Sequence, residues 1–203
     1  MGCLNPSKTK DNKVLVIVGP SGVGKDTVMR KVFEKYPDNF YKAVTHTSRG
    51  KREHEKEGEN YYYITKEDFE NKIKEDFFVE HNFYNDNYYG TSKMELKKGL
   101  SLNKIMYLII DINGANSIHN LKIPANFIAI VPKSFEVLEQ RLISRGTESE
   151  DKIKGRVETA KTELETINNS PFFNYQVIND QLDDAVNDMI NKLKELYPNF
   201  IKE

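Results

Sequence analysis

One glycine-rich run constrains the fold of this chain more than any other feature of its sequence. The run reads Gly19-Pro20-Ser21-Gly22-Val23-Gly24-Lys25-Asp26-Thr27. An apolar stretch, Val14–Val18, precedes it, and residues 25–36 have a helical pattern. A strand, a glycine loop and a helix in this order form a phosphate cradle, because backbone N–H groups turn inward and the lysine reaches the β- and γ-phosphates. The run therefore predicts a nucleoside triphosphate site, and this context disfavours a glycine-rich turn that binds nothing.

One position of the run departs from the usual phosphate-loop pattern. A Ser or Thr normally follows the lysine and binds Mg²⁺ through its hydroxyl, but this chain has Asp26. A carboxylate is also a hard oxygen ligand for Mg²⁺, although it adds negative charge beside the triphosphate. Thr27 points about 100° further around the helix, so it cannot replace the missing hydroxyl but could reach another phosphate. We hypothesise that Asp26 holds Mg²⁺ directly or through water.

Further apolar runs predict the fold class. Residues 105–111, 127–131 and 176–178 resemble buried strands, and each is followed by helix-compatible sequence. This alternation predicts an α/β fold of three layers around a central, mostly parallel sheet. With 203 residues the chain is expected to form one domain, residues 12–203, after a disordered leader, residues 1–11. Its core is expected to comprise residues 12–43, 95–134 and 166–203.

Two charged insertions interrupt this pattern. Residues 44–93 and 140–160 are rich in Arg, Lys, Glu and Tyr and poor in aliphatic residues, so we expect them to stay out of the main core. The first carries short β-like runs such as residues 61–64, and the second is helical with a break at Gly146. Segments of this kind can close over a ligand. We therefore predict a small mixed α/β lobe at residues 44–94 and a helical lid at residues 135–165.

The composition narrows the range of partners. The 30 basic and 31 acidic residues give a net charge of −1, which argues against a nucleic-acid partner. The chain has one cysteine, Cys3, no signal-peptide pattern and no apolar stretch approaching the roughly 18 residues that span a bilayer. These features favour a cytoplasmic protein with no membrane partner, and they leave the oligomeric state open between a monomer and a weak dimer.

A GTPase is one alternative for a chain with a phosphate loop. Residues 111–114 match the D-x-x-G motif of GTPases at the end of a predicted strand. In those proteins an N-K-x-D motif follows and reads guanine. The nearest match here, residues 65–68, lies upstream and is therefore in the wrong order. This order disfavours a GTPase.

The first insertion carries a more specific pattern. It contains residues 45–52 (Thr-His-Thr-Ser-Arg-Gly-Lys-Arg), Glu55, Gly58, Tyr61, Phe78-Val79-Glu80 and residues 87–91 (Asn-Tyr-Tyr-Gly-Thr). These residues resemble the nucleoside-monophosphate site of guanylate kinases, and the resemblance extends over roughly residues 14–185. It implies a P-loop kinase fold with a GMP-binding lobe and a lid. It also implies Mg²⁺-dependent transfer of a phosphoryl group from ATP to GMP, and to dGMP, giving ADP and GDP in purine metabolism.

The resemblance also implies roles for individual residues. For ATP it implies the loop residues 19–27 together with Arg141 and Arg145. For catalysis it implies Lys25, Arg49, Arg145 and Arg156. For GMP it implies Thr45, Arg49, Arg52, Tyr61, Glu80, Tyr89, Thr91 and Asp111.

The chemistry of these side chains agrees with the implied roles. Arginine forks and tyrosine hydroxyls suit a phosphate dianion. A carboxylate beside a hydroxyl complements the guanine N1–H and N2–H₂ donors and the O6 acceptor, whereas adenine would oppose the carboxylate with another acceptor.

Several alternatives remain open from the sequence. Arg49 and Arg52 could form a basic surface paired with Glu53 or Glu55, Asp111 could cap a strand end, and Arg141 could make salt bridges with Glu139 or Glu148. Ile109 stands where the family usually has an acidic residue near the metal, so Asp26 could replace that group, or both departures could be drift. A non-catalytic guanylate-kinase-like interaction module and a kinase for another monophosphate are the alternative functions.

Overall fold

The computed structural model describes residues 14–84, 86–144 and 150–201. Its strands are β1 (Val14–Val18), β2 (Phe40–Lys42), β3 (Thr45–Thr47), β4 (Tyr61–Tyr63), β5 (Phe78–Tyr84), β6 (Asn87–Ser92), β7 (Ile105–Ile109), β8 (Ala125–Val131) and β9 (Tyr175–Ile178). Its helices are α1 (Lys25–Lys35), α2 (Lys66–Lys74), α3 (Lys93–Ser101), α4 (Ile112–Asn120), α5 (Phe135–Ser144), α6 (Glu150–Asn169) and α7 (Leu182–Leu196).

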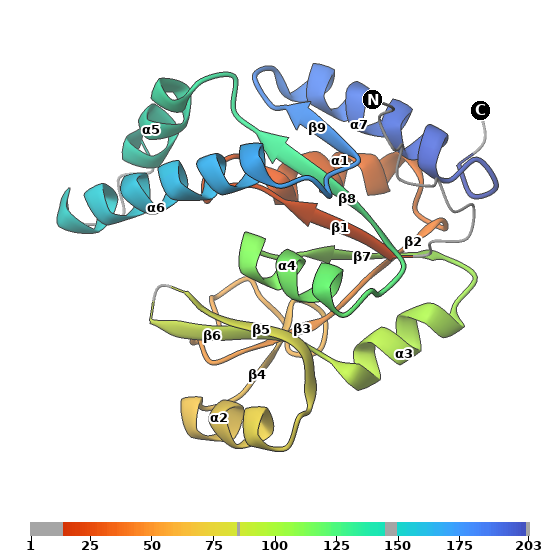
Figure 1. Ribbon diagram of the computed structural model, residues 1–203, viewed down its shortest axis with the longest axis vertical. Helices are drawn as coiled ribbons and strands as arrows, with labels where there is room; N and C mark the ends of the chain where they lie inside the picture. The colour runs from red at the N-terminus through yellow and green to blue at the C-terminus, as the bar shows by residue number, and fades with distance from the viewer. Residues whose placement is uncertain (1–13, 85, 145–149, 202–203) are drawn as a thin grey trace, which may run out of the picture.

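A central sheet organises the larger part of the molecule (Figure 1). Its strand order is β2-β7-β1-β8-β9, and every pair is parallel. Strand β1 lies in the middle of the sheet, and helices cover both of its faces. Leu15 and Ile17 pack into a cluster with side chains of α1, α5 and α7, whereas Val16 packs on the other face with side chains of α4 and the end of α6. The result is the three-layer α/β fold that the sequence predicts.

The four predicted core strands and the first helix are confirmed, with ends that shift by up to two residues. The expectation that residues 176–178 are buried is wrong except for Val177, because β9 lies at the sheet edge, where Ile178 is 57% exposed. One strand of the central sheet, β2, was not expected. It has three residues and lies at the sheet edge, so it offers too short an alternation of apolar and polar residues to be found by periodicity.

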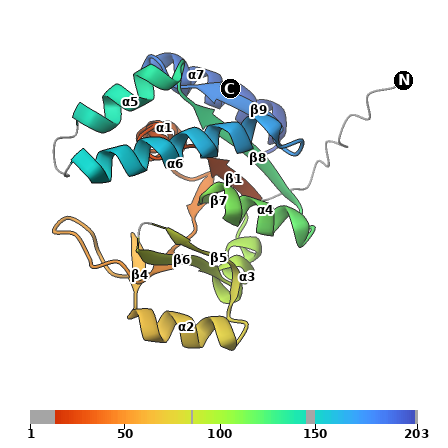
Figure 2. The same cartoon turned by 60° about the vertical axis from the view of Figure 1, so that its left-hand side comes forward.

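The first insertion forms a separate lobe with its own small sheet, in the order β4-β3-β6-β5. In both views this sheet and α2 lie together at one end of the molecule (Figure 2). Its core is aromatic: the ring of Phe69 stacks on Phe78 at 4.3 Å and on Tyr88 at 5.0 Å between centroids. The lobe thus has a core that is distinct from the two clusters around the central sheet.

The second insertion does not behave as expected. Leu142 and Ala160 are buried in the main core, as is Leu138 of the same α5 helix, so the prediction that residues 140–160 stay out of that core is wrong. The high charge of the segment hid a narrow apolar stripe that packs inward. Helix α5 ends at Ser144 and α6 begins at Glu150, while Gly146, Arg145 and the leader residues 1–11 lie outside the described residues.

Among the described helices, none is both long enough and apolar enough to cross a membrane.

Candidate active site

The glycine-rich run forms a tight loop between β1 and α1. Gly24 has φ = 95° at the N-terminus of α1, a left-handed conformation that favours glycine. A Cβ at this position would lie 2.6 Å from Nδ2 of Asn179, which donates a hydrogen bond of 2.7 Å to the carbonyl of Val23. Lys25 Nζ donates to the carbonyls of Gly19, at 2.6 Å, and Pro20, at 3.2 Å. The lysine is therefore held against the loop that it is expected to serve.

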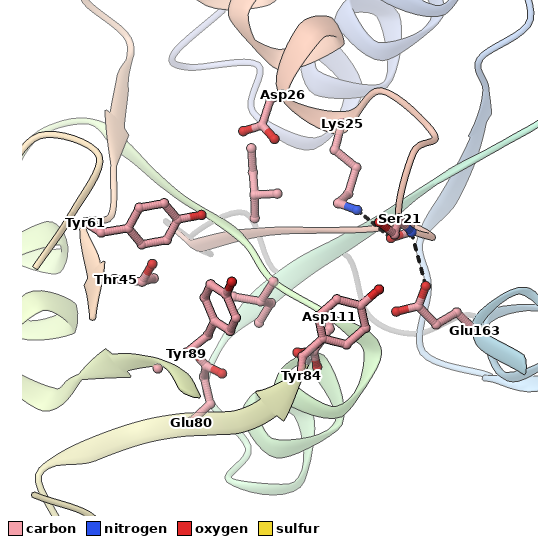
Figure 3. Close-up of a pocket in the computed structure, with 14 residues that line it drawn as sticks. Ser21, Lys25, Asp26, Thr45, Tyr61, Glu80, Tyr84, Tyr89, Asp111 and Glu163 are labelled. Atoms are coloured by element: carbon pink, nitrogen blue, oxygen red, sulfur yellow. Dashed lines mark hydrogen bonds between the residues drawn. The ribbon is translucent and has the colours of Figure 1, made fainter. Parts of the chain in front are cut away.

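A single cleft joins this loop to the lobe (Figure 3). Lys25 and Asp26 project into it from the start of α1, and Glu80 and Tyr89 face them from β5 and β6. Residues that lie some 55 positions apart in the chain thus share one cavity. The full lining is Gly19, Ser21, Lys25, Asp26, Thr45, Tyr61, Glu80, Tyr84, Tyr89, Gly90, Ile109, Ile110, Asp111 and Glu163.

Glu80 and Thr91 form a buried pair on adjacent strands. The Thr91 hydroxyl donates to Glu80 Oε1 at 2.6 Å, and the two residues are only 5% and 0% exposed. Burial raises the pKa of Glu80 to about 7, although the Thr91 hydrogen bond acts in the opposite direction. Glu80 reaches the cleft, whereas Thr91 contacts Glu80 and is absent from the cleft lining. A Cβ on Gly114 would lie 2.6 Å from Glu80 Oε2, so α4 closes the other side of the carboxylate.

The carboxylate of Asp111 accepts two hydrogen bonds, one through each of its oxygens. It is the N-cap of α4, where its Oδ1 accepts a hydrogen bond of 2.9 Å from the Gly114 N–H. Its Oδ2 accepts a hydrogen bond of 2.8 Å from Asn82 Nδ2. Asp111 thus caps the helix that follows β7 rather than the strand end itself, and the same side chain also lines the cleft.

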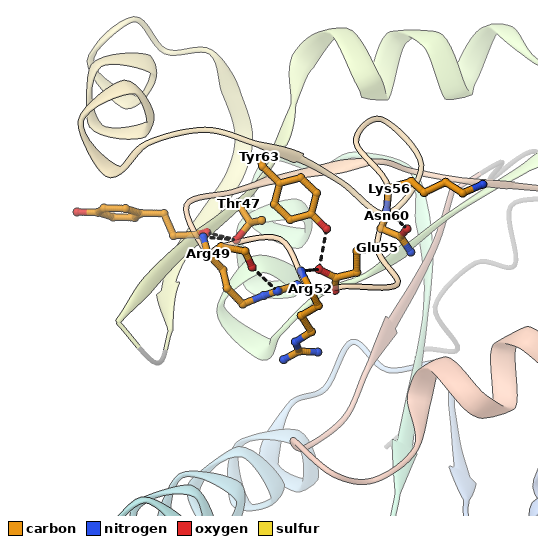
Figure 4. Close-up of polar contacts among 9 residues, drawn as sticks. Thr47, Arg49, Arg52, Glu55, Lys56, Asn60 and Tyr63 are labelled. Carbon is orange, nitrogen blue, oxygen red and sulfur yellow. Dashed lines mark hydrogen bonds and ion pairs between the residues drawn. The ribbon is translucent and has the colours of Figure 1, made fainter. Parts of the chain in front are cut away.

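Arg49 and Arg52 do not line the cleft. Arg49 forms an ion pair of 2.7 Å with Glu55, which is one of the alternatives that the sequence left open. Arg52 is exposed, and in Figure 4 its guanidinium points away from the Arg49–Glu55 pair. Tyr61 and Tyr89 line the cleft, and burial together with the Asp26 carboxylate raises the pKa of Tyr61 to about 12. Its hydroxyl is therefore a hydrogen-bond donor at neutral pH.

The lid arginines differ from one another. Arg141 donates to the carbonyls of Asn179, at 2.8 Å, and Asp180, at 3.0 Å. Glu148, one of the two acidic partners that the sequence suggested for it, lies outside the described residues. Arg156 donates to the Ser21 hydroxyl at 2.8 Å and thereby connects α6 to the glycine loop. Arg145 lies outside the described residues.

Among the polar side chains of the cleft, sequence reasoning missed Glu163 and Tyr84. Glu163 accepts a hydrogen bond of 3.2 Å from the Ser21 N–H, next to the hydroxyl that Arg156 holds. Burial raises the pKa of Glu163, although Lys25 and the Ser21 N–H act in the opposite direction. Glu163 follows Arg156 by seven residues, a spacing of two helical turns that could have revealed their shared face. Tyr84 is the last residue of β5 and also lines the cleft.

The Asp26 carboxylate is a candidate ligand for a metal ion in the cleft. The described residues contain no group of three or more His, Cys, Asp or Glu side chains that could enclose one. Mg²⁺ commonly takes one or two carboxylates, with phosphate oxygens and water completing its shell. The exposed Asp26 carboxylate beside Lys25 fits that donor set, whereas Thr27 is absent from the cleft lining and Ile109 supplies only an apolar wall.

The fold and this cleft define a class of protein: an α/β P-loop kinase in which the phosphate cradle faces a second, carboxylate-bearing pocket. The family model "Guanylate kinase" matches residues 11–196, and the chain belongs to the guanylate kinase family.

Individual relatives agree with this assignment. A guanylate kinase of Clostridium perfringens is 41% identical over 87% of this chain and 81% of its own length. Guanylate kinase 1 of Oryza sativa subsp. japonica is 39% identical over 91% of this chain and 48% of its own length. The crystal structure of guanylate kinase from Anaplasma phagocytophilum superposes with a TM-score of 0.70 at 26% identity, covering 90% of this chain and 84% of that chain.

Proposed function

We propose that this chain is an ATP:GMP phosphotransferase, which converts ATP and GMP to ADP and GDP and also accepts dGMP. The observation that carries the proposal is that Lys25 and Glu80 line one cleft. Such a cleft can hold a triphosphate and a purine monophosphate facing one another. Family membership supports the same reaction.

Glu80 and Thr91 select guanine in this proposal. The carboxylate accepts from the N1–H and N2–H₂ groups, and the Thr91 hydroxyl fixes the orientation of the carboxylate. Asp111 and Thr45 lie in the same lining and complete the polar surroundings of the base. Adenine would leave acceptors opposed in a buried site, and unpaired buried groups of this kind can discriminate by ~10⁴-fold.

The arginines and tyrosines of the lobe bind the monophosphate. Arg49 and Arg52 offer guanidinium groups, and the Tyr61 and Tyr89 hydroxyls donate to the remaining oxygens. Because Arg49 and Arg52 lie outside the present cleft lining, the proposal requires the lobe to move toward the core when GMP binds.

The glycine loop, residues 19–27, binds the ATP phosphates through its N–H groups, and Lys25 neutralises charge on the β- and γ-phosphates. Arg145 and Arg156 stabilise the transferring group, and Arg141 supports the ATP side through its contacts after β9.

In the reaction, an oxygen of the GMP phosphate bonds to the γ-phosphorus while the bond from that phosphorus to the β–γ bridging oxygen breaks. Positioning and charge neutralisation dominate such transfers, so no dedicated base is required. Closure of the lobe and lid excludes water and suppresses hydrolysis.

Mg²⁺, held by Asp26 and the ATP phosphates, would supply further charge neutralisation when bound. We expect Asp26→Ser to weaken metal affinity in the ADP complex by about tenfold, measured by electron paramagnetic resonance of bound Mn²⁺. If Asp26 replaces an acidic group missing at Ile109, adding Ile109→Asp to this variant should restore affinity non-additively. An unchanged affinity in Asp26→Ser would remove any special role for the carboxylate.

Two other functions remain to be separated by experiment. A non-catalytic interaction module does not need the intact loop glycines or Lys25, and a kinase for another monophosphate does not need the Glu80–Thr91 pair. A coupled assay of ADP release with GMP, dGMP, AMP, CMP, UMP or no acceptor tests all three. We expect release with GMP and dGMP only. Release with another acceptor would assign a different substrate, and no release at all would favour the interaction module.

We also place this activity in purine nucleotide metabolism, because GMP is consumed and GDP is formed. A cytoplasmic location, the lack of nucleic-acid and membrane partners, and the choice between a monomer and a weak dimer stay predictions.

A further inference from the structure

The loop of residues 48–60 between β3 and β4 is tied together by one carboxylate (Figure 4). Glu55 Oε1 accepts from Arg49 Nη2 at 2.7 Å. Its other oxygen, Oε2, accepts from the Arg52 N–H at 2.9 Å and from the Tyr63 hydroxyl at 2.8 Å. One side chain therefore connects the start of the loop, its middle and the strand that follows it.

These contacts fix the guanidinium of Arg49. Its Nη1 donates to the carbonyl of Gly50 at 2.7 Å, and its Cζ lies 5.4 Å from the centroid of the Tyr61 ring. The ion pair with Glu55 is only 15% exposed on each side. A guanidinium has five N–H donors, and these two hydrogen bonds engage two of them, so donors remain for a ligand. Tyr61, against whose ring this guanidinium lies, also lines the cleft.

The charges of the pair are strongly stabilised. Burial alone would raise the pKa of Glu55, but the hydrogen bonds from Arg49, the Arg52 N–H and Tyr63 outweigh it and lower the pKa to about 2. Burial alone would lower the pKa of Arg49, and Glu55 outweighs that effect. The pair is therefore fully ionised at neutral pH.

We propose that Glu55 is a positioning residue for phosphoryl transfer, which holds Arg49 ready to bind the phosphate of the acceptor nucleotide without itself touching that nucleotide. This inference rests on the proposed function, in which Arg49 and Arg52 bind the GMP phosphate. Preorganisation lowers the entropy lost when a flexible arginine is fixed, so it increases affinity without adding a contact.

The alternative is that Glu55 occupies the phosphate site and must leave when GMP binds. The geometry favours positioning. Both carboxylate oxygens are engaged by three donors of their own loop and strand, while the exposed Arg52 guanidinium points away from Glu55. A phosphate can therefore bind the remaining donors of Arg49 and Arg52 while Glu55 keeps its partners.

The test compares Glu55→Gln with Glu53→Gln, an exposed carboxylate in the same loop. A glutamine has one acceptor oxygen, and its NH₂ group would face a donor, so the three-way contact is lost. We expect KM for GMP to rise at least ~10-fold in Glu55→Gln, with KM for ATP unchanged. Inhibition by guanosine, which lacks the phosphate, should also be unchanged. Glu53→Gln should behave like the wild type.

Other variants separate positioning from a purely structural role. Arg49→Lys, Glu55→Gln and the double variant should be non-additive in KM for GMP if both residues act together. Should Glu55→Gln fail to fold, Glu55→Asp takes its place, because its shorter side chain cannot reach all three donors and should also raise KM for GMP.

Three results would overturn the inference. Tighter GMP binding in Glu55→Gln would show that the carboxylate competes with phosphate. If guanosine inhibition in Glu55→Gln weakened by the same factor as KM for GMP rises, Glu55 would only maintain the fold of the lobe. An unchanged KM for GMP would remove its role altogether. If the wild-type protein fails to phosphorylate GMP, the proposed function itself is wrong and the inference falls with it.

Discussion

At the scale of single residues, the cleft places ionisable groups where burial changes their chemistry. Glu80 is the clearest case, because it is buried yet must accept hydrogen bonds from a base as a carboxylate. Its neighbour Thr91 donates to it, but Asp111 adds a like charge nearby and raises its pKa further. Because burial favours the protonated form of a carboxyl group, a base that binds the ionised form must displace that proton.

We therefore expect GMP binding to depend on pH through Glu80. With a pKa of about 7, the carboxylate is mostly protonated at pH 6 and mostly ionised at pH 8, so KM for GMP should fall about tenfold as the pH rises between these values. Glu80→Gln should bind GMP more weakly and with a flat pH profile, and KM for ATP is the internal control. If KM for GMP depended on pH in the same way in the wild type and in Glu80→Gln, the pH dependence would belong to another group.

The raised pKa of Glu80 also makes the stability of the ligand-free protein depend on pH. Between the unfolded pKa, 4.5, and about 7, the folded protein holds a proton that the unfolded chain has lost. Stability from this group is therefore present below pH 4.5 and is lost as the pH rises to about 7. The melting temperature of Glu80→Gln relative to the wild type should consequently be higher at pH 8 than at pH 5.

At the scale of elements, the lid helices are anchored more firmly than their sequence suggests. Leu138 of α5 is fully buried, and Leu142 packs against the glycine loop, where a Cβ on Gly22 would lie 2.7 Å from its Cδ2. Helix α6 reaches the same loop through the Arg156 and Glu163 contacts with Ser21. Motion of these helices and the geometry of the loop are therefore coupled by direct contact.

We expect Leu138→Ala to lower the free energy of unfolding by ~2–5 kcal/mol, because it leaves a cavity in the main core. Ile143→Ala on the same helix is the control: Ile143 is 53% exposed, so its truncation should change stability by less than ~0.5 kcal/mol. Denaturant unfolding measures both. Equal, small effects would mean that α5 is not part of the core.

At the scale of the whole molecule, the fold brings two binding sites to one cleft from segments that are separated in the sequence, one around Lys25 and the other around Glu80. The phosphate loop comes from the start of the central sheet, and the base pocket comes from the lobe. Each site should therefore bind its ligand without the other, and both ligands should bind together.

Thermal unfolding with GMP, ADP or both tests this arrangement. Each ligand at 100 times its Kd should stabilise the protein by ~2.7 kcal/mol, and a mixture should stabilise it more than either ligand alone. Glu80→Gln should lose mainly the GMP effect, and Lys25→Met mainly the ADP effect. If ADP cancels the effect of GMP, the two ligands compete for one site.

The sequence by itself determined the features that depend on local order along the chain. The strand–loop–helix order around Gly24 predicted the phosphate cradle, because the conformation of the loop depends on adjacent glycines. The strands β1, β7 and β8 were recognisable because both of their faces are buried and need apolar side chains. The pattern around Arg49, Glu80 and Tyr89 gave the resemblance to the family.

Only the tertiary structure decided which distant groups meet. Glu163 reaches Ser21 across 142 positions, and Arg141 reaches the carbonyls of the two residues that follow β9. The ion pair of Arg49 with Glu55, rather than with Glu53, likewise depends on how the loop returns toward Tyr63. The energy of such contacts depends on position and burial in three dimensions, and neither is encoded by local spacing.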